Sequence, residues 1–349
     1  MTTRIFVPRD AAARPVGADK VAVAIAQEAN GKGLGVEIVR TGSRGLFWLE
    51  PLVEIEMPGG RIGFGPVAVR AVASLFADGL PGASHPLCVG RPEEIPFLKR
   101  QTRITFARCG IVDPLSLADY RAHGGWRGLE RARSLGPAAT VEEVTKSGLR
   151  GRGGAGFPTG IKWKTVADTA ADRKYIVCNA DEGDSGTYAD RMIMEGDPFL
   201  LIEGMAIAGF AVGATKGYIY IRSEYPDAIR VMERAIALAE REGLLGPEAR
   251  FDLEVRVGAG AYVCGEETSL LESLEGKRGQ VRAKPPLPAH KGLFGKPTVI
   301  NNLISLATVP AILADGADHY AALGMGRSRG TMPIQLARNV VDGGVFVGA

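Results

Sequence analysis

The chain has 349 residues, of which 46% are hydrophobic and 23% charged, so it can bury a full core and should form about two or three domains. Its formal net charge of +3 is close to neutral for this length, and without a long basic run it does not indicate a nucleic-acid partner. This composition also excludes disordered, collagen-like and coiled-coil proteins.

Neither the N-terminus nor the most apolar segment indicates export or a membrane span. Charges at Arg4, Arg9 and Asp10 leave no apolar core for a signal peptide. Residues 199–214 are too few to cross a bilayer and include Glu203. We therefore expect a cytoplasmic protein.

The cysteines and histidines suggest no metal site. Four cysteines are scattered without a CxxC pair and without a histidine at ligand spacing, which predicts neither disulfides nor a zinc or iron–sulfur site in this chain. The four histidines lie in unrelated polar contexts, and none resembles a general base.

The first ninety residues predict a small α/β domain. We expect a strand at 4–7, a helix at 19–30, a strand at 36–40, a hairpin of 52–57 with 61–64, and a helix at 67–77. This order is typical of a thioredoxin-like domain, which we assign to residues 1–90. Its redox cysteines are absent, since only Cys88 lies nearby, so we interpret it as a packing domain.

The remainder alternates strands and helices, which predicts a second α/β domain over residues 91–325. Thr140 and Glu143 form a T-x-x-E capping box that should open a helix ending before residue 148. Asp197-Pro198 should start another helix. Strands are expected at 174–177, 217–221, 251–257 and 332–336, and helices at 114–122, 198–212, 226–242, 266–275 and 298–314, with a long loop at 276–299.

The stretch GLRGRGGAGFPTGIKW, residues 148–163, is the most informative. Its glycines together with Arg150, Arg152 and Lys162 indicate a backbone held open beside an anionic, planar ligand such as a flavin or nucleotide. A plain surface turn would need neither a cation nor an aromatic such as Phe157. The embedded G-x-G-x-x-G pattern follows a helix rather than a strand, so we reject a Rossmann fingerprint.

Polar side chains follow three other predicted elements. NADEGDSG, residues 179–186, comes after a strand, Glu266 and Glu267 open a helix, and Asn301-Asn302 precede an apolar run. These groups could be a solvated acidic turn and simple helix caps, although capping needs only one carboxylate or one Asn. Ligands of open α/β sheets bind at the carboxyl ends of strands, which favours a binding site. Hydride chemistry, carried by a cofactor, fits a chain without a catalytic triad.

Four motifs in the same order then identify a family resemblance. GLRGRGGAGFPTGIKW, NADEGDSGTYADR, GAGAYVCGEE with LLESLEGKRGQ, and KPPLPAHKGLFGKPTVINN resemble the flavin- and NADH-binding subunit of respiratory NADH dehydrogenase. Related subunits occur in NAD-reducing hydrogenases and in molybdenum-containing, NAD-dependent formate dehydrogenases. The resemblance covers about residues 100 to 349 and implies an FMN- and NAD(H)-binding domain with the start of a ubiquitin-like domain at residues 326–349.

The front end, with RIFVPRDAAA and GSRGLFWLEPLVE, resembles the beta subunit of soluble formate dehydrogenases. The implied function is to pass electrons from formate through iron–sulfur clusters to FMN, and as hydride to NAD. The implied partners are an iron–sulfur and molybdenum catalytic subunit and a small two-iron subunit. The alternatives are an NADH dehydrogenase or hydrogenase diaphorase subunit, or a non-catalytic scaffold.

The resemblance also implies roles for individual residues. Phe157 should stack on the adenine of NADH, and Lys162 should stabilise negative charge on reduced flavin. The residues implied for FMN are Gly151, Arg152, Gly153, Lys162, Asn179, Asp181, Glu182, Tyr262, Gly265, Glu266, Glu267, Asn301 and Asn302. Those implied for NAD(H) are Gly154, Ala155, Gly156, Phe157, Asp184 and Glu267.

The sequence departs from the family pattern in two respects. Thr165 and Leu287 stand where some relatives carry further aromatics around the adenine, so stacking should be weaker or differently arranged. The family continues into a region whose cysteines hold a four-iron cluster, and those ligands are absent from this chain. We therefore expect no metal in the chain itself.

Overall fold

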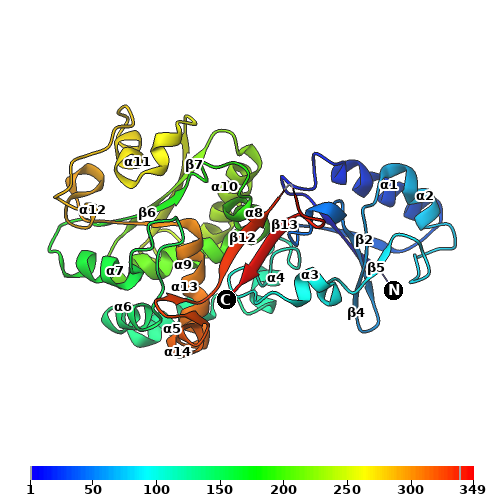
Figure 1. Ribbon diagram of the computed structural model, residues 1–349, viewed down its shortest axis with the longest axis horizontal. Coiled ribbons are helices and arrows are strands. Elements are labelled where there is room, and N and C mark those ends of the chain that lie inside the picture. Colours follow the sequence, from blue (N-terminus) through cyan, green and yellow to red (C-terminus); the bar gives the residue numbers. More distant parts are fainter. Residues whose placement is uncertain (1, 338) are drawn as a thin grey trace.

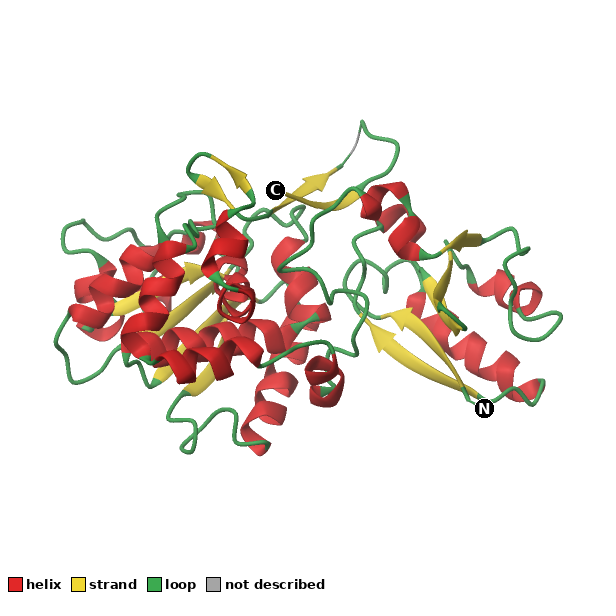
Figure 2. Cartoon of the chain, turned by 90° about the horizontal axis from the view of Figure 1, so that it is seen from below, coloured by secondary structure: helices red, strands yellow, loops and turns green. Residues whose placement is uncertain are grey.

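The computed structural model describes residues 2–337 and 339–349. Figure 1 shows a smaller N-terminal unit beside a larger one, with the last two strands between them. Each unit is built on its own sheet, and Figure 2 shows most helices gathered around the strands of the larger unit. The chain is therefore of the α/β class, as expected.

The N-terminal unit is a five-stranded mixed sheet of order β2-β1-β3-β4-β5. Strand β1 pairs parallel with β2 and antiparallel with β3, and β3 to β5 continue antiparallel. The predicted order of strand, helix, strand, strand, strand, helix is confirmed, although the last helix is only one turn long. The elements are β1 (Thr3–Pro8), α1 (Ala18–Gly31), β2 (Val36–Thr41), β3 (Val53–Met57), β4 (Gly60–Phe64), α2 (Val72–Leu75) and β5 (Cys88–Gly90).

The larger unit contains a four-stranded parallel sheet of order β8-β7-β6-β9. The strands are β6 (Tyr175–Ala180), β7 (Lys216–Arg222), β8 (Asp252–Gly258) and β9 (Thr298–Asn302). The helices that precede, join or follow them are α3 (Pro96–Lys99), α4 (Leu117–Ala122), α5 (Arg127–Leu135), α6 (Pro137–Lys146), α7 (Thr159–Asp168), α8 (Ala189–Gly196), α9 (Pro198–Val212), α10 (Pro226–Arg241), α11 (Glu267–Leu274), α12 (Pro288–Lys291), α13 (Leu303–Asp315) and α14 (Ala317–Ala321).

Helix α9 is the centre of this unit. It begins with Asp197 as the N-cap and Pro198 at the first position, as predicted, and every residue except Phe210 is buried. Its one acid, Glu203, accepts hydrogen bonds from the Tyr120 hydroxyl at 2.6 Å, from the Trp126 N–H at 2.8 Å and from the Leu129 N–H at 2.9 Å. The carboxylate thus satisfies backbone donors at the start of α5. In the part of the chain that is described, none of the helices combines the length and the apolar character that crossing a bilayer requires.

Two local predictions are wrong. Thr140 does not cap a helix, because Pro137 starts α6 three residues earlier and the Thr140 hydroxyl donates to the Gly136 carbonyl at 2.8 Å. Residues 298–314 are not one helix: the β-branched run ending at Asn302 is strand β9, and α13 begins at Leu303. A short apolar run fits either structure, and pairing with β6 decides for the strand.

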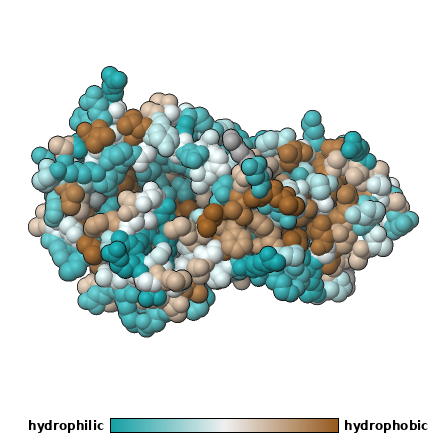
Figure 3. All heavy atoms as spheres, in the orientation of Figure 1, coloured by the Kyte–Doolittle hydropathy of each residue, from teal (hydrophilic) through white to brown (hydrophobic). Residues whose placement is uncertain are grey.

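The C-terminal strands join the two units. β12 (Met332–Leu336), predicted as a strand, pairs antiparallel with β13 (Gly344–Gly348). The Val345 N–H donates to the Gly45 carbonyl of the N-terminal unit at 3.1 Å, and Thr102 donates to the Val347 carbonyl at 3.1 Å. Apolar side chains gather over the middle of the face in Figure 3, and β12 adds the exposed Met332 and Ile334. The domain limits at 90 and 325 remain predictions.

Candidate functional site

The carboxyl ends of the four parallel strands lie at one edge of the sheet, and the predicted polar residues are brought together there. Asn179 lies near the end of β6, and its side-chain amide donates to the Gly265 carbonyl at 2.8 Å. Gly265 belongs to a 3-10 turn, Tyr262–Gly265, that follows β8. The NADEGDSG and GAGAYVCGEE segments, separate in the sequence, are therefore in contact, at the place where open α/β sheets bind ligands.

Asp181 is the most informative side chain of this edge. It is only 1% exposed, and neither of its carboxylate oxygens has a hydrogen-bond partner among the described residues. Burial raises the pKa of Asp181 to about 6, although Arg222 acts in the opposite direction. A buried acceptor left unpaired costs free energy, which a ligand donor can recover.

Two glycines and a tyrosine surround the Asp181 carboxylate. A Cβ atom at Gly183 would lie 2.9 Å from an Asp181 oxygen and 3.1 Å from the Tyr262 ring, and one at Gly265 would lie 3.2 Å from the same carboxylate. Tyr262 itself is 73% exposed. Only glycine backbone flanks the carboxylate at these two positions, and an aromatic ring lies beside it.

The glycine stretch folds as a loop between α6 and α7. Phe157 and Gly151 close it through a 2.9 Å backbone hydrogen bond, and a Cβ at Gly153 would lie 3.0 Å from the Cβ of Asn302. The loop follows a helix, as predicted, and therefore differs from a Rossmann turn. Its second half was not expected to be helical, but Pro158 and Thr159 start α7 there. The loop rests against the end of β9, with Gly154 and Ala155 exposed.

Phe157 is 49% exposed at the end of this loop rather than packed in the core. Its contact with NADH stays a prediction. Asp184, predicted on the same side, is also exposed, and its carboxylate accepts a 3.3 Å hydrogen bond from Gly186. Thr165 donates to the Ile161 carbonyl within α7, while Leu287 is exposed.

Lys162 links the loop to the other segments. Its ammonium donates to the Ile300 carbonyl at 2.7 Å and lies 3.2 Å from Glu267. Lys284, which sequence reasoning missed, lies 2.9 Å from both Glu266 and Glu267. Burial alone would raise the pKa of Glu267, but Lys162 and Lys284 outweigh it and lower this pKa. The edge thus holds an ordered array of alternating charges.

The structure gives several predicted residues a clear structural role. Glu266 caps α11 by accepting from the N–H groups of Thr268 at 2.8 Å and Ser269 at 2.9 Å. Burial opposes ionisation, but the Thr268 hydroxyl, Lys284 and these amides lower the pKa of Glu266 to about 2. Glu182 turns its carboxylate into α8, where it pairs with Arg191 at 2.8 Å. Both carboxylates therefore have structural partners, and their contact with FMN stays a prediction.

Arg152 and the two asparagines also hold the site together. The Arg152 guanidinium donates to the Tyr320 hydroxyl at 2.9 Å and to the Arg329 carbonyl, which anchors the loop. Asn301 accepts from the Trp163 indole at 3.0 Å. Asn302 caps α13 through the Ile304 N–H at 2.9 Å. Capping was the alternative left open for these asparagines, and each one has a separate partner.

Asp190 is a buried acid of the site that sequence reasoning missed. The Asn302 side-chain amide donates to it at 3.2 Å. Burial, followed by repulsion from Glu182, raises the pKa of Asp190 well above its ordinary value. Asp190 lies inside the NADEGDSGTYADR motif, which could have marked it as a candidate, but its burial depends on how α8 packs. Among the described residues no group of three His, Cys, Asp or Glu side chains could hold a metal ion.

Comparison with known proteins agrees with this arrangement. Residues 144–311 match the family model described as the Nuo51 FMN-binding domain. The NADP-reducing hydrogenase subunit HndC of Solidesulfovibrio fructosivorans is 49% identical over 253 residues, covering 71% of this chain and 51% of the relative. An NADH-quinone oxidoreductase subunit of Aquifex aeolicus is 48% identical over 236 residues, covering 66% of this chain and 55% of the relative.

A solved structure extends the likeness to nearly the whole chain. A crystal structure of an NAD+-reducing [NiFe]-hydrogenase in the air-oxidized state matches with a TM-score of 0.62 and 28% identity, covering 99% of this chain and 58% of that chain. The chain thus spans about half the length of the curated relatives it matches. Residues 144–311 therefore belong to the family of the Nuo51 FMN-binding domain, and over about two thirds of its length the chain is similar to HndC and to the NADH-quinone oxidoreductase subunit.

Proposed function

We propose that the chain binds FMN and NAD(H) at the carboxyl edge of its parallel sheet and acts as a flavin subunit of the diaphorase type. It would exchange hydride with the nicotinamide and electrons with iron–sulfur centres of partner subunits. The observation that carries this proposal is the Asp181 carboxylate, buried, without a partner among the described residues, and bordered by Gly183 and Gly265. A polyol or amine group of a cofactor is the kind of donor that such an acceptor needs.

The residues around this carboxylate fit a flavin. Asn179 and Asp181 would take the polar part of FMN, while the loop around Gly153 and the exposed Phe157 would border the planar rings and the incoming NADH. Lys162 would present its ammonium to charge that develops on the ring. When bound, FMN supplies hydride exchange and single-electron exchange, which the side chains present cannot supply themselves.

The chain's own groups orient the two ligands. Lys162 is fixed by the Ile300 carbonyl and Glu267, so its charge needs little reorganisation when the ligands bind. Glu182, Glu266 and Asn302 fix the backbone of three segments that form the edge. Glycines at the contact positions let two planar rings approach the backbone closely.

The electron donor is the open part of the proposal. Hydrogenase and NADH-quinone oxidoreductase names among the relatives favour a diaphorase-type subunit. Formate as the donor is supported only by the resemblance of the RIFVPRDAAA and GSRGLFWLEPLVE segments. Purifying the native complex decides: a molybdenum-containing partner identifies formate dehydrogenase, and a nickel–iron partner identifies a hydrogenase. A small two-iron subunit and a cytoplasmic location are proposed in either case.

The test of the site itself needs only the purified chain and FMN. After reconstitution and gel filtration, the protein should retain flavin absorbance, and NADH should bleach it under anaerobic conditions. An artificial electron acceptor should then reoxidise the flavin, so that NADH oxidation continues. A chain that retains no FMN, or retains FMN that NADH does not reduce, would act as a scaffold, and the assignment would fail.

A further inference from the structure

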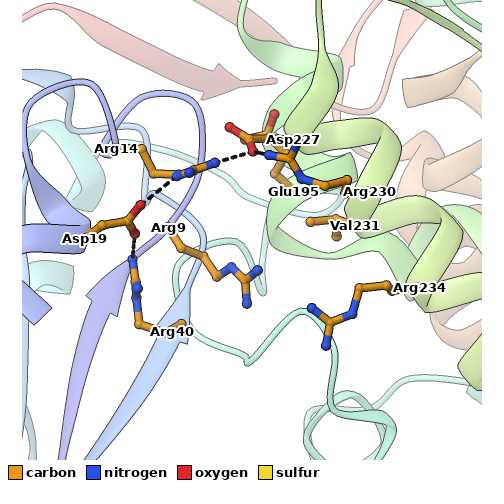
Figure 4. Close-up of a pocket in the computed structure, with 9 residues that line it drawn as sticks. All are labelled: Arg9, Arg14, Asp19, Arg40, Glu195, Asp227, Arg230, Val231 and Arg234. Carbon is orange, nitrogen blue, oxygen red and sulfur yellow. Dashed lines mark hydrogen bonds and ion pairs between the residues drawn. The ribbon is translucent and has the colours of Figure 1, made fainter. Parts of the chain in front are cut away.

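A cavity of about 320 Å³ lies between the two units, and none of its lining residues is among those proposed above for FMN or NAD(H). Figure 4 shows the arginines that line it, approaching from both sides. Three come from the N-terminal unit and two from α10: Arg9, Arg14, Arg40, Arg230 and Arg234. Among the described residues only three acids line the same cavity, and nothing in the proposed function uses it.

Three of the arginines form ion pairs with two aspartates. Asp19 pairs with Arg14 at 2.9 Å and with Arg40 at 2.6 Å. Asp227 on α10 pairs with Arg14 and with Arg230. Arg14 thereby links the two units, and these side chains are held in place without any ligand.

Arg9 and Arg234 have no carboxylate partner within residues 2–337 and 339–349. In Figure 4 their guanidinium groups point toward each other across the open part of the cavity. Arg9 is partly buried, and burial, followed by the nearby Arg40 and Arg234, lowers its pKa. Two cations that face each other at a half-buried position repel unless an anion lies between them.

The third acid of the lining is Glu195. It is buried at the cavity wall and accepts a 2.5 Å hydrogen bond from the Ala11 N–H, while its other oxygen has no partner in the described part of the chain. Burial and the neighbouring Asp10 raise the pKa of Glu195 to about 8, and the five arginines of the lining outnumber its three acids in any case. The cavity is therefore strongly positive, with a buried and unpaired polar group in its wall.

We propose that this cavity binds a compact oxyanion of the phosphate class between Arg9 and Arg234. Guanidinium groups bind phosphate oxygens with two parallel hydrogen bonds, and two of them opposite each other can hold one tetrahedral anion. Of the described residues that line the cavity, only Val231 is apolar, and none carries an aromatic ring that could stack on a base. The ligand is thus free phosphate or a small phosphorylated molecule without a base.

The position gives this anion a mechanical role. Arg9 follows β1 and Arg234 lies on α10, so one bound anion would connect the two units in addition to the existing Arg14–Asp227 pair. A ligand that binds only the folded form raises the thermal midpoint, and the rise grows with ligand concentration. Phosphate should therefore stabilise the junction between the units.

The experiment measures binding to the FMN-saturated protein in phosphate-free buffer at constant ionic strength. Isothermal titration and thermal unfolding are recorded with inorganic phosphate, pyrophosphate, glycerol phosphate and citrate. We expect a phosphate-dependent rise in Tm, and tighter binding of pyrophosphate. Glycerol phosphate distinguishes the sources: binding equal to phosphate identifies a phosphorylated metabolite, and weaker binding identifies the free ion.

Variants locate the site. R234Q and R9Q should each weaken phosphate binding about tenfold, the loss of charge-assisted hydrogen bonds. R241Q, an exposed arginine on the same helix, is the matched control and should bind as the original protein does. Absence of a phosphate-dependent shift, equal weakening by R241Q, or a preference for citrate over pyrophosphate would overturn the proposal. Because FMN retention is measured on the same samples, failure here is distinct from failure of the flavin site.

Discussion

The Lys162 ammonium lies 3.2 Å from the Glu267 carboxylate, a residue 105 positions away in the sequence. The pair connects the helix after the glycine loop with the helix after β8. A second bond, to the Ile300 carbonyl, also fixes the ammonium. The ammonium proposed to face the flavin is therefore oriented by two other segments of the edge.

Replacing Lys162 should change the redox potential of bound flavin. Lys162→Gln removes a cation that favours the reduced, more negative form, so the midpoint potential should fall by about 30 mV for a tenfold effect on a two-electron couple. Spectroelectrochemical titration measures it. Lys164→Gln, an exposed lysine on the same helix, should leave the potential unchanged. An unshifted potential in Lys162→Gln would refute the role.

Replacing Asp181 should weaken FMN binding without lowering the stability of the fold. Asp181→Asn removes a buried, unpaired carboxylate, so FMN affinity should fall about tenfold while the folded protein is unharmed or slightly stabilised. Fluorescence titration of FMN and thermal unfolding measure the two effects. Asp252→Asn, at the opposite end of the same sheet and exposed, is the control. Full FMN affinity in Asp181→Asn would remove the main support for the site.

Phe157 should act on NADH alone. Phe157→Ala removes a half-exposed ring, so the KM for NADH should rise about tenfold, in line with the free energy of stacking on one base. FMN content and Tm should not change. Ile161→Ala removes a side chain of similar exposure on α7 and should leave the KM as it is. If both variants raised the KM equally, the loss of an exposed apolar side chain, and not the loss of stacking on NADH, would explain the change.

Stability should fall as pH rises through neutrality. Burial and the nearby Asp10 raise the pKa of both Glu50 and Glu195 to about 8. In the folded protein these carboxyls keep protons that the unfolded chain releases above its ordinary pKa of 4.5. Their stabilising effect is complete below that value and is lost as pH approaches 8.

Urea unfolding between about pH 5 and pH 8 measures this dependence, because the range lies between the ordinary pKa of the unfolded carboxyl and the raised pKa of the folded one. Each carboxyl should contribute a slope of roughly 1.4 kcal/mol per pH unit. Glu50→Gln should flatten the curve, whereas Glu130→Gln, exposed on α5, should not. Parallel curves for the original protein and Glu50→Gln would contradict the raised pKa.

The sequence predicted the parts of the site that depend on strand order. Asn179 and Gly265 lie at or soon after the ends of strands that the sequence predicted, and parallel pairing brings such positions to one edge whatever the details of packing. Asn302 ends β9, which the sequence had placed in a helix. Gly153 and Asn302, both predicted for the same site, lie in segments that touch, since a Cβ added at Gly153 would lie 3.0 Å from the Cβ of Asn302. The four motifs of the family were sufficient to anticipate FMN and NAD(H), which the family match supports.

The sequence did not reveal which side chains would be occupied by structural bonds. Glu182 and Asp181 are neighbours of the same type, yet one pairs with Arg191 and the other has no partner among the described residues. The backbone at Glu182 is left-handed, with φ of 40°, and turns the two side chains apart. The pattern of apolar and polar residues in the sequence does not reveal this conformation. Helix α7 was missed because Pro158 and Gly160 suggest a loop, whereas Gly160 is needed for close contact with Thr145.

Helix α9 has apolar side chains all round, and such a helix could pack in many rotations with similar burial. A shift of one residue turns every side chain by about 100°. Glu203 would then leave the Tyr120 hydroxyl and the α5 amides and carry its carboxylate into hydrocarbon, at a cost of several kcal/mol. One acid therefore selects a single alignment of the central helix, and with it the position of the strands whose ends form the site.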